Sequence, residues 1–585
     1  YPYLQTARWR QALQDHGANP PGDLDGQIAS FLRAHEGEPV TQDLRTIWLT
    51  SLAARARWTE FLTFHKPSSD GLALRCHGYT ARIAQGSDAG LATQVAETWL
   101  TPRSLQECDR AFTWLASAGA LTPALIEQRA RNALMAGNAG FARQIIARLP
   151  QKQAAPLLQW ATLLDDPQRG IDALIATPQK DVEPAALLAG WTKLARTNRT
   201  AARLRFEPLA RSRGLDAQAA SPFALALALA LSWDRDADAR NFFARVDATT
   251  FDDSAREWQA RAALWAHDWK LATRSIAAMS EGTRRTARWR YWAARAAAHE
   301  GKQEAARQMY ESLLAEDNYY SAMAAARLKR PITPNARPSA ADAALLARLG
   351  TQAEFIRARE LRVNGLLEPA RAEWRAGAAL LAANLRPQLI HLAAGWGWFH
   401  LAVDTATGER VFNDYALLYP RPYDAEVKIA AKLSGLPATL LYGVIRQESL
   451  YEPGAASSAD ARGLMQLTLD TARRTARKWQ LAVPTADALF QPAVNVALGA
   501  AHLKDLMERF DGQVALALAG YNAGPGAVQR WLPAGEMDPD IWIENIPYNE
   551  TRAYVQRILW HGVVFGWLEE AKAQRTLHWL DRIRP

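Results

Sequence analysis

The 585-residue chain lacks features that would place it in several common classes of protein. Its longest apolar run, residues 223–231, is far shorter than the ~20 residues of a membrane-spanning helix, so we expect no transmembrane segment. Although 69 Lys and Arg residues exceed 60 Asp and Glu residues, no basic run is longer than two residues. Because phosphate binding needs concentrated basic charge, we expect no nucleic-acid partner.

Motifs for metals and nucleotides are missing as well. The 11 histidines form no His-Glu-x-x-His pattern, and no glycine-rich loop is followed by Lys-Ser or Lys-Thr, so we expect no metal site and no cofactor. The only two cysteines, Cys76 and Cys108, are too few for a four-ligand zinc site. They are either two buried thiols or one disulfide in an oxidising compartment, and these residues alone leave both readings open.

Strand-like segments are almost absent, and helix-forming residues dominate. Residues 1–415 are rich in Ala, Leu, Arg and Glu, and apolar side chains recur at spacings of three and four. Since a chain of 585 residues is too long to fold around one compact core, we expect several domains or an extended repeat. The sequence therefore predicts an all-α fold.

A short pattern repeats within this helical part. A glycine is followed five residues later by Ala-Arg at Gly137, Gly301 and Gly365, and more loosely the same spacing recurs at His267 and Gly397. The intervals approach multiples of the ~34 residues of a helix-turn-helix unit. The glycine supplies the turn and the small alanine permits close helix packing, so the pattern predicts stacked hairpins that form a superhelix.

Two proline-rich stretches, residues 331–338 and 419–422, are expected to separate domains. We predict an α-superhelical domain over residues 1–335, a helical linker domain over 336–418 and a compact third domain over 419–585.

The third domain carries the candidate chemistry. Residues 437–448 read PATLLYGVIRQE, and Glu448 ends an apolar stripe that includes Leu440 and Val444. Half burial of a carboxyl group disfavours its charged form and raises its pKa, as a general acid requires at neutral pH. The alternative is a carboxylate bonded to Arg446 or to the backbone.

Three further segments carry groups suited to sugar recognition. They read SSADARGLMQ at 457–466, AGYNAGPG at 519–526 and IPYNETRAYV at 546–555. Gly463 allows a close approach of the backbone, and Gln466 offers both a donor and an acceptor. Each segment taken alone is also compatible with an ordinary turn or helix start.

Four segments taken together resemble the large, ring-shaped soluble lytic transglycosylases of bacterial cell walls. They are RQES at 446–449, GLMQ at 463–466, YNAGPG at 521–526 and IPYNETRAYV at 546–555. The resemblance is strong over the last third of the chain and weaker over the helical part. It implies a ring of helices, a smaller linker domain and a lysozyme-like catalytic domain, and we expect a monomer.

The resemblance also implies an activity. Such enzymes cleave the β-1,4 bond between N-acetylmuramic acid and N-acetylglucosamine of peptidoglycan without adding water, and a 1,6-anhydro ring forms. We expect exolytic action in cell-wall turnover, in the periplasm, after removal of a signal peptide that is not part of this chain. That compartment favours a disulfide between Cys76 and Cys108. Cell-wall synthases are candidate partners, and the alternatives are a muramidase that uses water or a non-catalytic murein-binding scaffold.

The resemblance implies that Glu448, in the RQES segment, is the catalytic acid. It implies substrate binding by Ser457, Met465, Gln466, Tyr521, Asn522 and Glu550. Tyr521 is expected to hydrogen-bond near Glu448, whereas Asn522 braces its turn. The residues at 460–462 (Asp-Ala-Arg) and 467–469 (Leu-Thr-Leu) depart from the family pattern, so the subsite contacts there stay open. Glu452 and Asp460 are weaker candidates for a second carboxylate.

Overall fold

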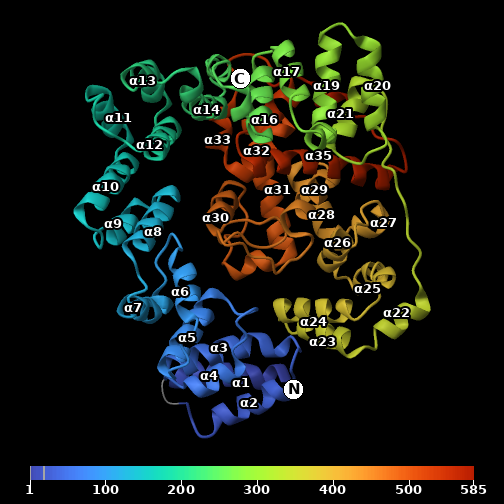
Figure 1. Ribbon diagram of the computed structural model, residues 1–585. Helices are drawn as coiled ribbons and strands as arrows, with labels where there is room; N and C mark the ends of the chain where they lie inside the picture. Colours follow the sequence, from blue (N-terminus) through green and yellow to red (C-terminus); the bar gives the residue numbers. More distant parts are fainter. Residues whose placement is uncertain (1, 18–19) are drawn as a thin grey trace. The chain divides into compact units, whose positions relative to one another are not determined.

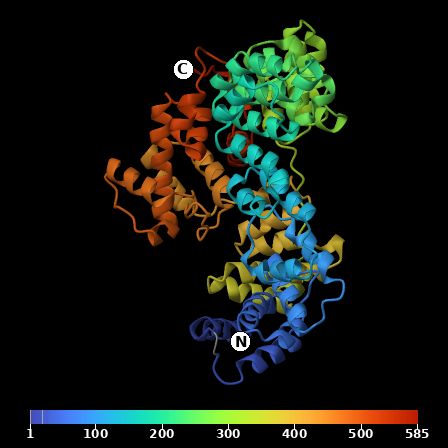
Figure 2. The same ribbon diagram turned by 60° about the vertical axis from the view of Figure 1, so that its left-hand side comes forward.

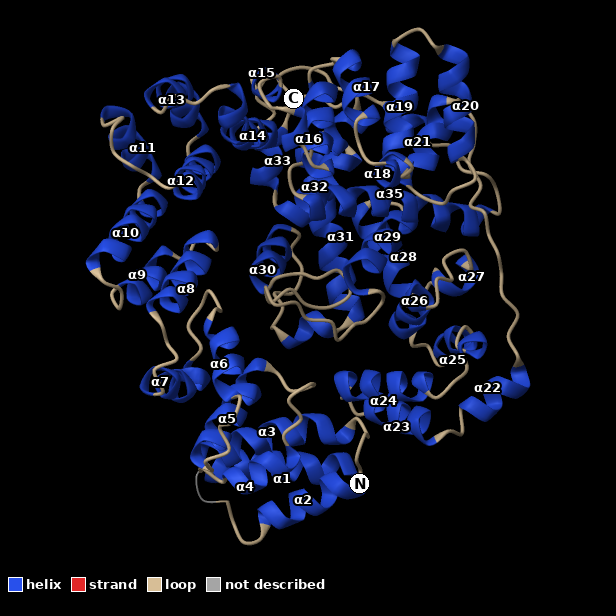
Figure 3. Ribbon diagram, viewed as in Figure 1, coloured by secondary structure: helices blue, strands red, loops and turns tan. Residues whose placement is uncertain are grey.

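The computed structural model describes residues 2–17 and 20–585, and throughout that part the only regular secondary structure is helical (Figure 3). Isolated β-bridges occur, but no described segment forms a strand. The predicted all-α fold class is thus confirmed. Among these residues, no helix combines the length and the apolar character that crossing a membrane requires.

The chain divides into two compact units, one formed by residues 1–226 and 353–377 and the other by residues 227–352 and 378–585. The helices of the first unit are α1 (Pro2–His16), α2 (Leu24–Ala34), α3 (Val40–Ala54), α4 (Trp58–Phe64), α5 (Leu72–Ala84), α6 (Leu91–Trp99), α7 (Asp109–Ser117), α8 (Pro123–Met135), α9 (Ala139–Ile146), α10 (Gln151–Asp165), α11 (Pro167–Ala176), α12 (Pro184–Thr197), α13 (Arg199–Ser212), α23 (Ala353–Val363) and α24 (Leu367–Ala379).

The second unit contains α15 (Ala239–Phe243), α16 (Asp253–Trp265), α17 (Trp269–Ala277), α18 (Glu281–Arg284), α19 (Ala287–His299), α20 (Gln303–Leu313), α21 (Tyr319–Arg327), α22 (Ala343–Leu349), α25 (Gln388–Gly395), α26 (Phe399–Gly408), α27 (Tyr415–Leu418), α28 (Asp424–Ser434), α29 (Ala438–Ser449), α30 (Leu469–Lys478), α31 (Pro492–Arg509), α32 (Val514–Ala523), α33 (Pro525–Trp531), α34 (Pro539–Glu544) and α35 (Asn549–Glu570). Helix α14 (Ala217–Trp233) contains the boundary between the units, and short 3-10 helices lie at 106–108, 248–250, 383–385, 487–490 and 577–580.

The predicted repeat forms helical hairpins. The turns of the pairs α8–α9, α19–α20 and α23–α24 contain Gly137, Gly301 and Gly365, whose φ angles are +76°, +83° and +75°. Glycine adopts this left-handed conformation without the steric cost that a side chain brings. In each pair the alanine five residues further on is at most 2% exposed, so the helices approach closely where the pattern predicts it. The repeat prediction is confirmed.

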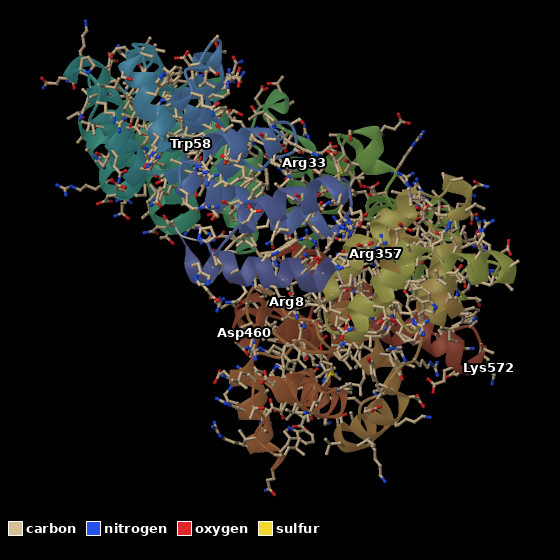
Figure 4. All side chains as sticks on the ribbon, turned by 90° about the horizontal axis from the view of Figure 1, so that it is seen from below. Arg8, Arg33, Trp58, Arg357, Asp460 and Lys572 are labelled. Carbon is tan, nitrogen blue, oxygen red and sulfur yellow. A yellow bond between two sulfur atoms is a disulfide. The ribbon has the colours of Figure 1, made fainter. Side chains whose placement is uncertain are left out.

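Within the first unit, two contacts tie distant parts of the chain. The structure joins Cys76 on α5 to Cys108 by a disulfide. The Tyr3 hydroxyl on α1 donates a 2.6 Å hydrogen bond to the buried carboxylate of Glu373 on α24, which also accepts from Arg357, labelled in Figure 4. The second contact explains why residues 353–377 belong to the same unit as the N-terminal helices.

Reducing the disulfide should weaken the first unit. The bridge closes a loop with a sequence separation of 32 residues. Constraint of such a loop in the unfolded chain contributes about 3–4 kcal/mol to the free energy of unfolding. Urea denaturation with and without a thiol reductant measures the difference. The double variant Cys76→Ser/Cys108→Ser is the control and should not respond to reductant; an equal response in both proteins would contradict the prediction.

The second unit is organised around a buried carboxylate on the short helix α34. Glu544 accepts hydrogen bonds from Trp292 Nε1 at 3.0 Å and from the Tyr320 hydroxyl at 2.8 Å. Its carboxylate also lies 3.1 Å from Arg261 and 3.6 Å from Arg288. Burial alone would raise the pKa of Glu544, but the charges of Arg288 and Arg261 lower it to about 2. The carboxylate therefore stays ionised inside the protein.

A second buried carboxylate, Asp540, lies one helical turn earlier on α34. It accepts from the hydroxyl of Tyr291 and from Arg327 at 2.8 Å, and Arg295 lies 3.1 Å away. These partners come from α19 and α21, so the last hairpins of the superhelix pack on the helices that follow residue 419. Figures 1 and 2 both show these green hairpins beside the red C-terminal helices, and α16 contacts α34 while α21 contacts α35.

The compact units cut across the predicted domains because this buried network joins residues 253–327 to the C-terminal helices. Both predicted boundaries nevertheless fall between helices. Residues 328–342 contain no helix, and residues 419–423 separate α27 from α28. The boundaries at 335/336 and 418/419 stay a prediction.

Replacing Glu544 by Gln should destabilise the second unit. The amide keeps the shape but leaves the buried Arg261 and the half-buried Arg288 without a full negative charge beside them. Breaking a buried ion pair in this way costs about 3–5 kcal/mol. Urea denaturation measures the loss, with Glu536→Gln as the control because its side chain is 56% exposed. Equal losses in the two variants would show that the network does not stabilise the protein.

Candidate active site

Helix α29 presents the predicted acid at its C-terminal end. The helix starts after Pro437, its N-cap, and ends at Ser449, because Leu450 adopts a left-handed φ of +47°. Gly443 on α29 lies against α35, where a Cβ atom would make an ordinary 3.4 Å contact with Ile558 Cγ2. The two helices are neighbours in Figure 1. Glu448, in the last turn of α29, therefore faces residues of α35.

The Glu448 carboxyl group has the properties predicted for a general acid. Burial raises its pKa to about 7, a hydrogen bond from Tyr554 opposes this rise, and the charge of Glu550 adds to it. The Tyr554 hydroxyl donates to Glu448 Oε1 at 2.6 Å. Arg446 instead lies over the ring of Tyr419, with its guanidinium carbon 4.2 Å from the ring centroid. The alternative in which Arg446 neutralises Glu448 is therefore wrong.

Two tyrosines lie near Glu448, and only one of them bonds its carboxyl group. The Tyr521 hydroxyl donates to the backbone carbonyl of Met465 at 2.8 Å, whereas Tyr554 binds the acid. Burial and the charge of the nearby Glu448 raise the pKa of Tyr521 well above its ordinary value. The ring of His502 lies 5.3 Å from that of Tyr521, and burial lowers the pKa of His502 to about 4. This histidine is thus neutral at pH 7.

The segment 455–467 folds into a compact loop beside this pair. Arg462 forms antiparallel bridges with Ala456 and Leu467. Gly463 is required because its φ is +77° and because a Cβ atom would lie 2.1 Å from the Leu489 carbonyl oxygen. Buried Asn495 holds the loop from α31, accepting from the Met465 N–H at 2.7 Å and donating to the Arg462 carbonyl at 2.8 Å. The sequence offered no motif for this asparagine.

Three of the predicted substrate-binding residues lie on this loop in different environments. The Met465 side chain is buried, so it packs inside the protein and stabilises the loop. Gln466 donates to the carbonyls of Ala455 and Gly463, and no described group donates to its own carbonyl oxygen. Ser457 is exposed, and its hydroxyl accepts from the backbone of residues 459 and 461.

The two remaining predicted residues contact each other. Asn522 Nδ2 donates to Glu550 Oε1 at 3.5 Å, and Asn522 Oδ1 accepts from the Thr551 hydroxyl at 2.6 Å. Asn522 thus joins the YNAGPG segment to the start of α35. Glu550 is exposed, and its charge acts on Glu448. The structure therefore brings Glu448, Tyr521, Asn522 and Glu550 into one region.

The weaker carboxylate candidates lie in less suitable surroundings. Asp460 is exposed and accepts from Arg462 Nε at 3.0 Å, and Figure 4 labels it in the orange part of the chain. Arg462 is therefore engaged by a neighbour on its own loop. Glu452 is buried just beyond the end of α29.

Tyr554 was not among the predicted site residues, although it lies within the IPYNETRAYV segment. Glu550, Tyr554 and Ile558 follow each other at a spacing of four on α35, so they share one face of the helix. That periodicity could have identified Tyr554 as facing α29. The sequence gives no signal for which tyrosine reaches the acid.

In residues 2–17 and 20–585, no cluster of three or more His, Cys, Asp and Glu side chains is arranged to hold a metal ion. The chemistry of the site rests on a half-buried carboxyl group that exists in both protonation states near pH 7, with a tyrosine donor against it. A carboxyl group tuned in this way is the general acid of glycoside-cleaving enzymes.

The comparisons with known proteins agree with this class. The family described as "Transglycosylase SLT domain" matches residues 426–540, and "Soluble lytic murein transglycosylase L domain" matches residues 348–414. The soluble lytic murein transglycosylase of Escherichia coli K12 is 26% identical over 568 residues, covering 96% of this chain and 86% of the relative. That of Salmonella typhimurium is 26% identical over 565 residues, with the same coverage.

Solved structures give the same result. An inactive glutamate-to-glutamine mutant of the lytic transglycosylase Slt from Pseudomonas aeruginosa is 27% identical, with a TM-score of 0.83 over 98% of this chain and 93% of that one. The 70-kDa soluble lytic transglycosylase of E. coli has the same fold, with a TM-score of 0.87 over 100% and 94% at 24% identity. The chain is thus similar to soluble lytic transglycosylases over nearly its whole length, and it is a peptidoglycan lytic transglycosylase.

The contacts of Glu448 predict opposite shifts of the pH–activity profile in two variants. Tyr554→Phe removes a hydrogen bond that favours the carboxylate, so the pKa of Glu448 should rise. Glu550→Gln removes a negative charge that disfavours the carboxylate, so the pKa should fall. We expect each shift to be about 0.5–1 pH unit.

The measurement is kcat/KM between pH 5 and 9, where the alkaline limb reports loss of the acid's proton. The limb should move to higher pH in Tyr554→Phe and to lower pH in Glu550→Gln. Glu569→Gln, a change at the far end of α35, is the control. Shifts in the same direction in both variants would contradict the assignment of these contacts.

Proposed function

We propose that this enzyme cleaves the β-1,4 bond between N-acetylmuramic acid and N-acetylglucosamine and closes a 1,6-anhydro ring on the muramic acid. Protonated Glu448 donates its proton to the glycosidic oxygen as the bond from that oxygen to the anomeric carbon breaks. The resulting carboxylate then accepts the proton of the 6-hydroxyl as that oxygen attacks the anomeric carbon. The leaving sugar gains a hydroxyl, Glu448 regains its proton and no water is consumed.

The observation that carries this proposal is the pKa of Glu448, raised to about 7 by burial. At neutral pH the group is present both as acid and as carboxylate, so a single side chain can give a proton and take one back. The related Pseudomonas protein is inactive when one glutamate is replaced by glutamine, which supports a reaction that depends on one glutamate.

Tyr554 is a positioning residue in this scheme, because its hydroxyl holds one carboxyl oxygen and leaves the other to face the substrate. We assign saccharide contacts to Ser457, Gln466, Tyr521 and Glu550. Gln466 has an unused carbonyl oxygen among the described residues, which suits a sugar hydroxyl or amide N–H. Asn522 orients Glu550, and Met465 contributes its carbonyl to hold Tyr521.

The wider setting is proposed on the family resemblance. We propose exolytic action in cell-wall turnover, a monomeric enzyme in the periplasm and docking to cell-wall synthases, with domains at 1–335, 336–418 and 419–585. The Cys76–Cys108 disulfide supports an oxidising compartment.

A muramidase is the second candidate, because Glu550 lies near enough for its charge to act on Glu448. In that reaction Glu550 would activate a water molecule, as the second carboxylate of an inverting glycosidase does. Mass spectrometry of digested murein separates the two reactions, since the anhydro product is lighter by one water. Anhydro products from both wild type and Glu550→Gln would support the transglycosylase; hydrolysed products that disappear in Glu550→Gln would support the muramidase.

Glu448→Gln should abolish cleavage without unfolding the protein. The amide keeps the shape of the side chain but cannot donate a proton as an acid. Because one group acts as both acid and base, the rate should fall by at least ~10²–10⁴. Release of soluble muropeptides from purified sacculi measures the rate, and circular dichroism checks the fold. Asp460→Asn is the matched control and should retain wild-type activity; a folded Glu448→Gln protein with near wild-type release would exclude Glu448 as the acid.

A further inference from the structure

Gln466, the last residue of the GLMQ segment, has an unfavourable backbone conformation. Its φ of +48° lies in the left-handed region, which is uncommon for a residue with a side chain and costs free energy. Such strain persists only where the surrounding structure enforces it, and it is concentrated at functional sites. The contacts that enforce this conformation therefore bear on what the 455–467 loop does in the reaction.

The side chain of Gln466 is fixed together with its backbone. Its amide nitrogen donates to the carbonyls of Ala455 at 3.1 Å and Gly463 at 2.9 Å. The nitrogen and the oxygen of an amide diverge from its carbon atom, so Oε1 of Gln466 faces away from these two carbonyls. The side chain is only partly buried, and no described group donates to Oε1. A different φ at Gln466 would therefore redirect the oxygen that we assign to the saccharide.

The preceding residue, Met465, is held at both of its backbone polar groups. Its N–H donates to Asn495 Oδ1 on α31 at 2.7 Å, and its carbonyl accepts from the Tyr521 hydroxyl on α32 at 2.8 Å. Helices α31 and α32 contact each other along their lengths and are neighbours in Figure 1. Because the Met465 carbonyl belongs to the peptide group that leads into Gln466, these two helices fix one side of its φ angle.

Asn495 holds the other side of Gln466 as well. Its amide nitrogen donates to the carbonyls of Arg462 and Leu489, each at 2.8 Å. The same Arg462 carbonyl accepts at 3.0 Å from the N–H of Leu467, the residue that follows Gln466. Asn495 is 0% exposed, so one fully buried side chain is bonded to the chain on both sides of Gln466.

A glycine one turn further along α31 provides the space for Met465. Asn495 and Gly499 are four residues apart, so they share one face of the helix. A Cβ atom at position 499 would lie 2.4 Å from Met465 Sδ and 2.7 Å from Met465 Cβ, which no side chain tolerates without moving. The fit of Met465 on α31 thus depends on both residues.

We propose that Asn495 is a positioning residue for the reaction: it keeps Gln466 in its left-handed conformation and so directs Gln466 Oε1 toward the saccharide. This role rests on the saccharide contact assigned to Gln466 above. Asn495 itself does not touch the substrate, because it is fully buried. A purely structural asparagine would have a different effect. Partial unfolding lowers the amount of active enzyme and hence the apparent kcat, whereas loss of a saccharide contact raises KM.

The test is a double-mutant cycle, with kcat and KM measured on soluble, uncrosslinked peptidoglycan strands. Asn495→Ala and Gln466→Ala should each raise KM about tenfold and leave kcat within about twofold of wild type. The double variant should also show a KM raised only about tenfold, because Asn495 acts through Gln466. An unchanged KM in folded Asn495→Ala overturns the proposal, and so does a KM raised about a hundredfold in the double variant, which would make the two effects independent.

A second substitution tests the same contact without removing a hydrogen bond, should Asn495→Ala fail to fold. Gly499→Ala crowds Met465, so it should raise KM in the wild-type background and have no further effect on KM in Gln466→Ala. Leu503→Ala is the control, because Leu503 is fully buried on the same helix and its truncation destabilises the protein. Its KM should stay at the wild-type value. An equal rise of KM in Leu503→Ala would show that loss of stability alone causes the effect, and would overturn the proposal.

Failure of this proposal can be distinguished from failure of the proposed function. An unchanged KM in Gln466→Ala would refute the saccharide contact of Gln466 and the role of Asn495 together. A raised KM in Gln466→Ala with an independent effect of Asn495→Ala would refute only the role of Asn495. The masses of the products identify the reaction itself in every variant, and they do not depend on KM.

Discussion

Asp540 and Glu544 are ionised carboxylates on one short helix, and almost no water reaches them. Such groups are tolerated only when charges of opposite sign compensate for their lost hydration. The compensation comes from Arg261, Arg288 and Arg295, which belong to the repeat hairpins, and from Arg327 on α21. Helix α34 leads directly into α35, which carries Glu550 and Tyr554. The position of the site residues on α35 thus depends on contacts made by helices some 200–300 residues earlier in the chain.

The protein uses burial in two opposite ways. Glu544 is surrounded by arginines, so its pKa falls to about 2 and it remains a fixed charge. Glu448 is half-buried beside a tyrosine and near another carboxylate, with no cation against it, so its pKa rises to about 7. Desolvation acts on both groups in the same direction, and their partners decide the outcome. The neighbouring charges therefore set the direction of each pKa shift, and they distinguish the structural carboxylate from the reactive one.

The sequence predicted those features that local spacing determines. Gly137, Gly301 and Gly365 occupy left-handed turns because a short-range pattern identifies a hairpin. The elevated pKa of Glu448 also followed from its place at the end of an apolar stripe. Both depend on residues within a few turns of each other.

Long-range partners could not be predicted in this way. Tyr554 is separated from Glu448 by 106 residues, and no spacing rule chooses it over Tyr521. Asn495 reaches the Met465 loop from 30 residues away, through a side chain that carries no motif. The network around α34 joins residues more than 200 apart and makes the compact units differ from the predicted domains. Such pairs can be identified only from the three-dimensional packing of the helices.

The direction of α29 has a consequence of its own. A helix carries a macrodipole whose negative end is its C-terminus, and Glu448 lies in the last turn of α29. The peptide dipoles of that helix therefore favour the protonated carboxyl group, in addition to the effect of burial. With identical neighbours but opposite chain polarity, the same side chain would lie at a positive end and would give up its proton more readily. The polarity of the backbone is thus itself part of what makes Glu448 an acid.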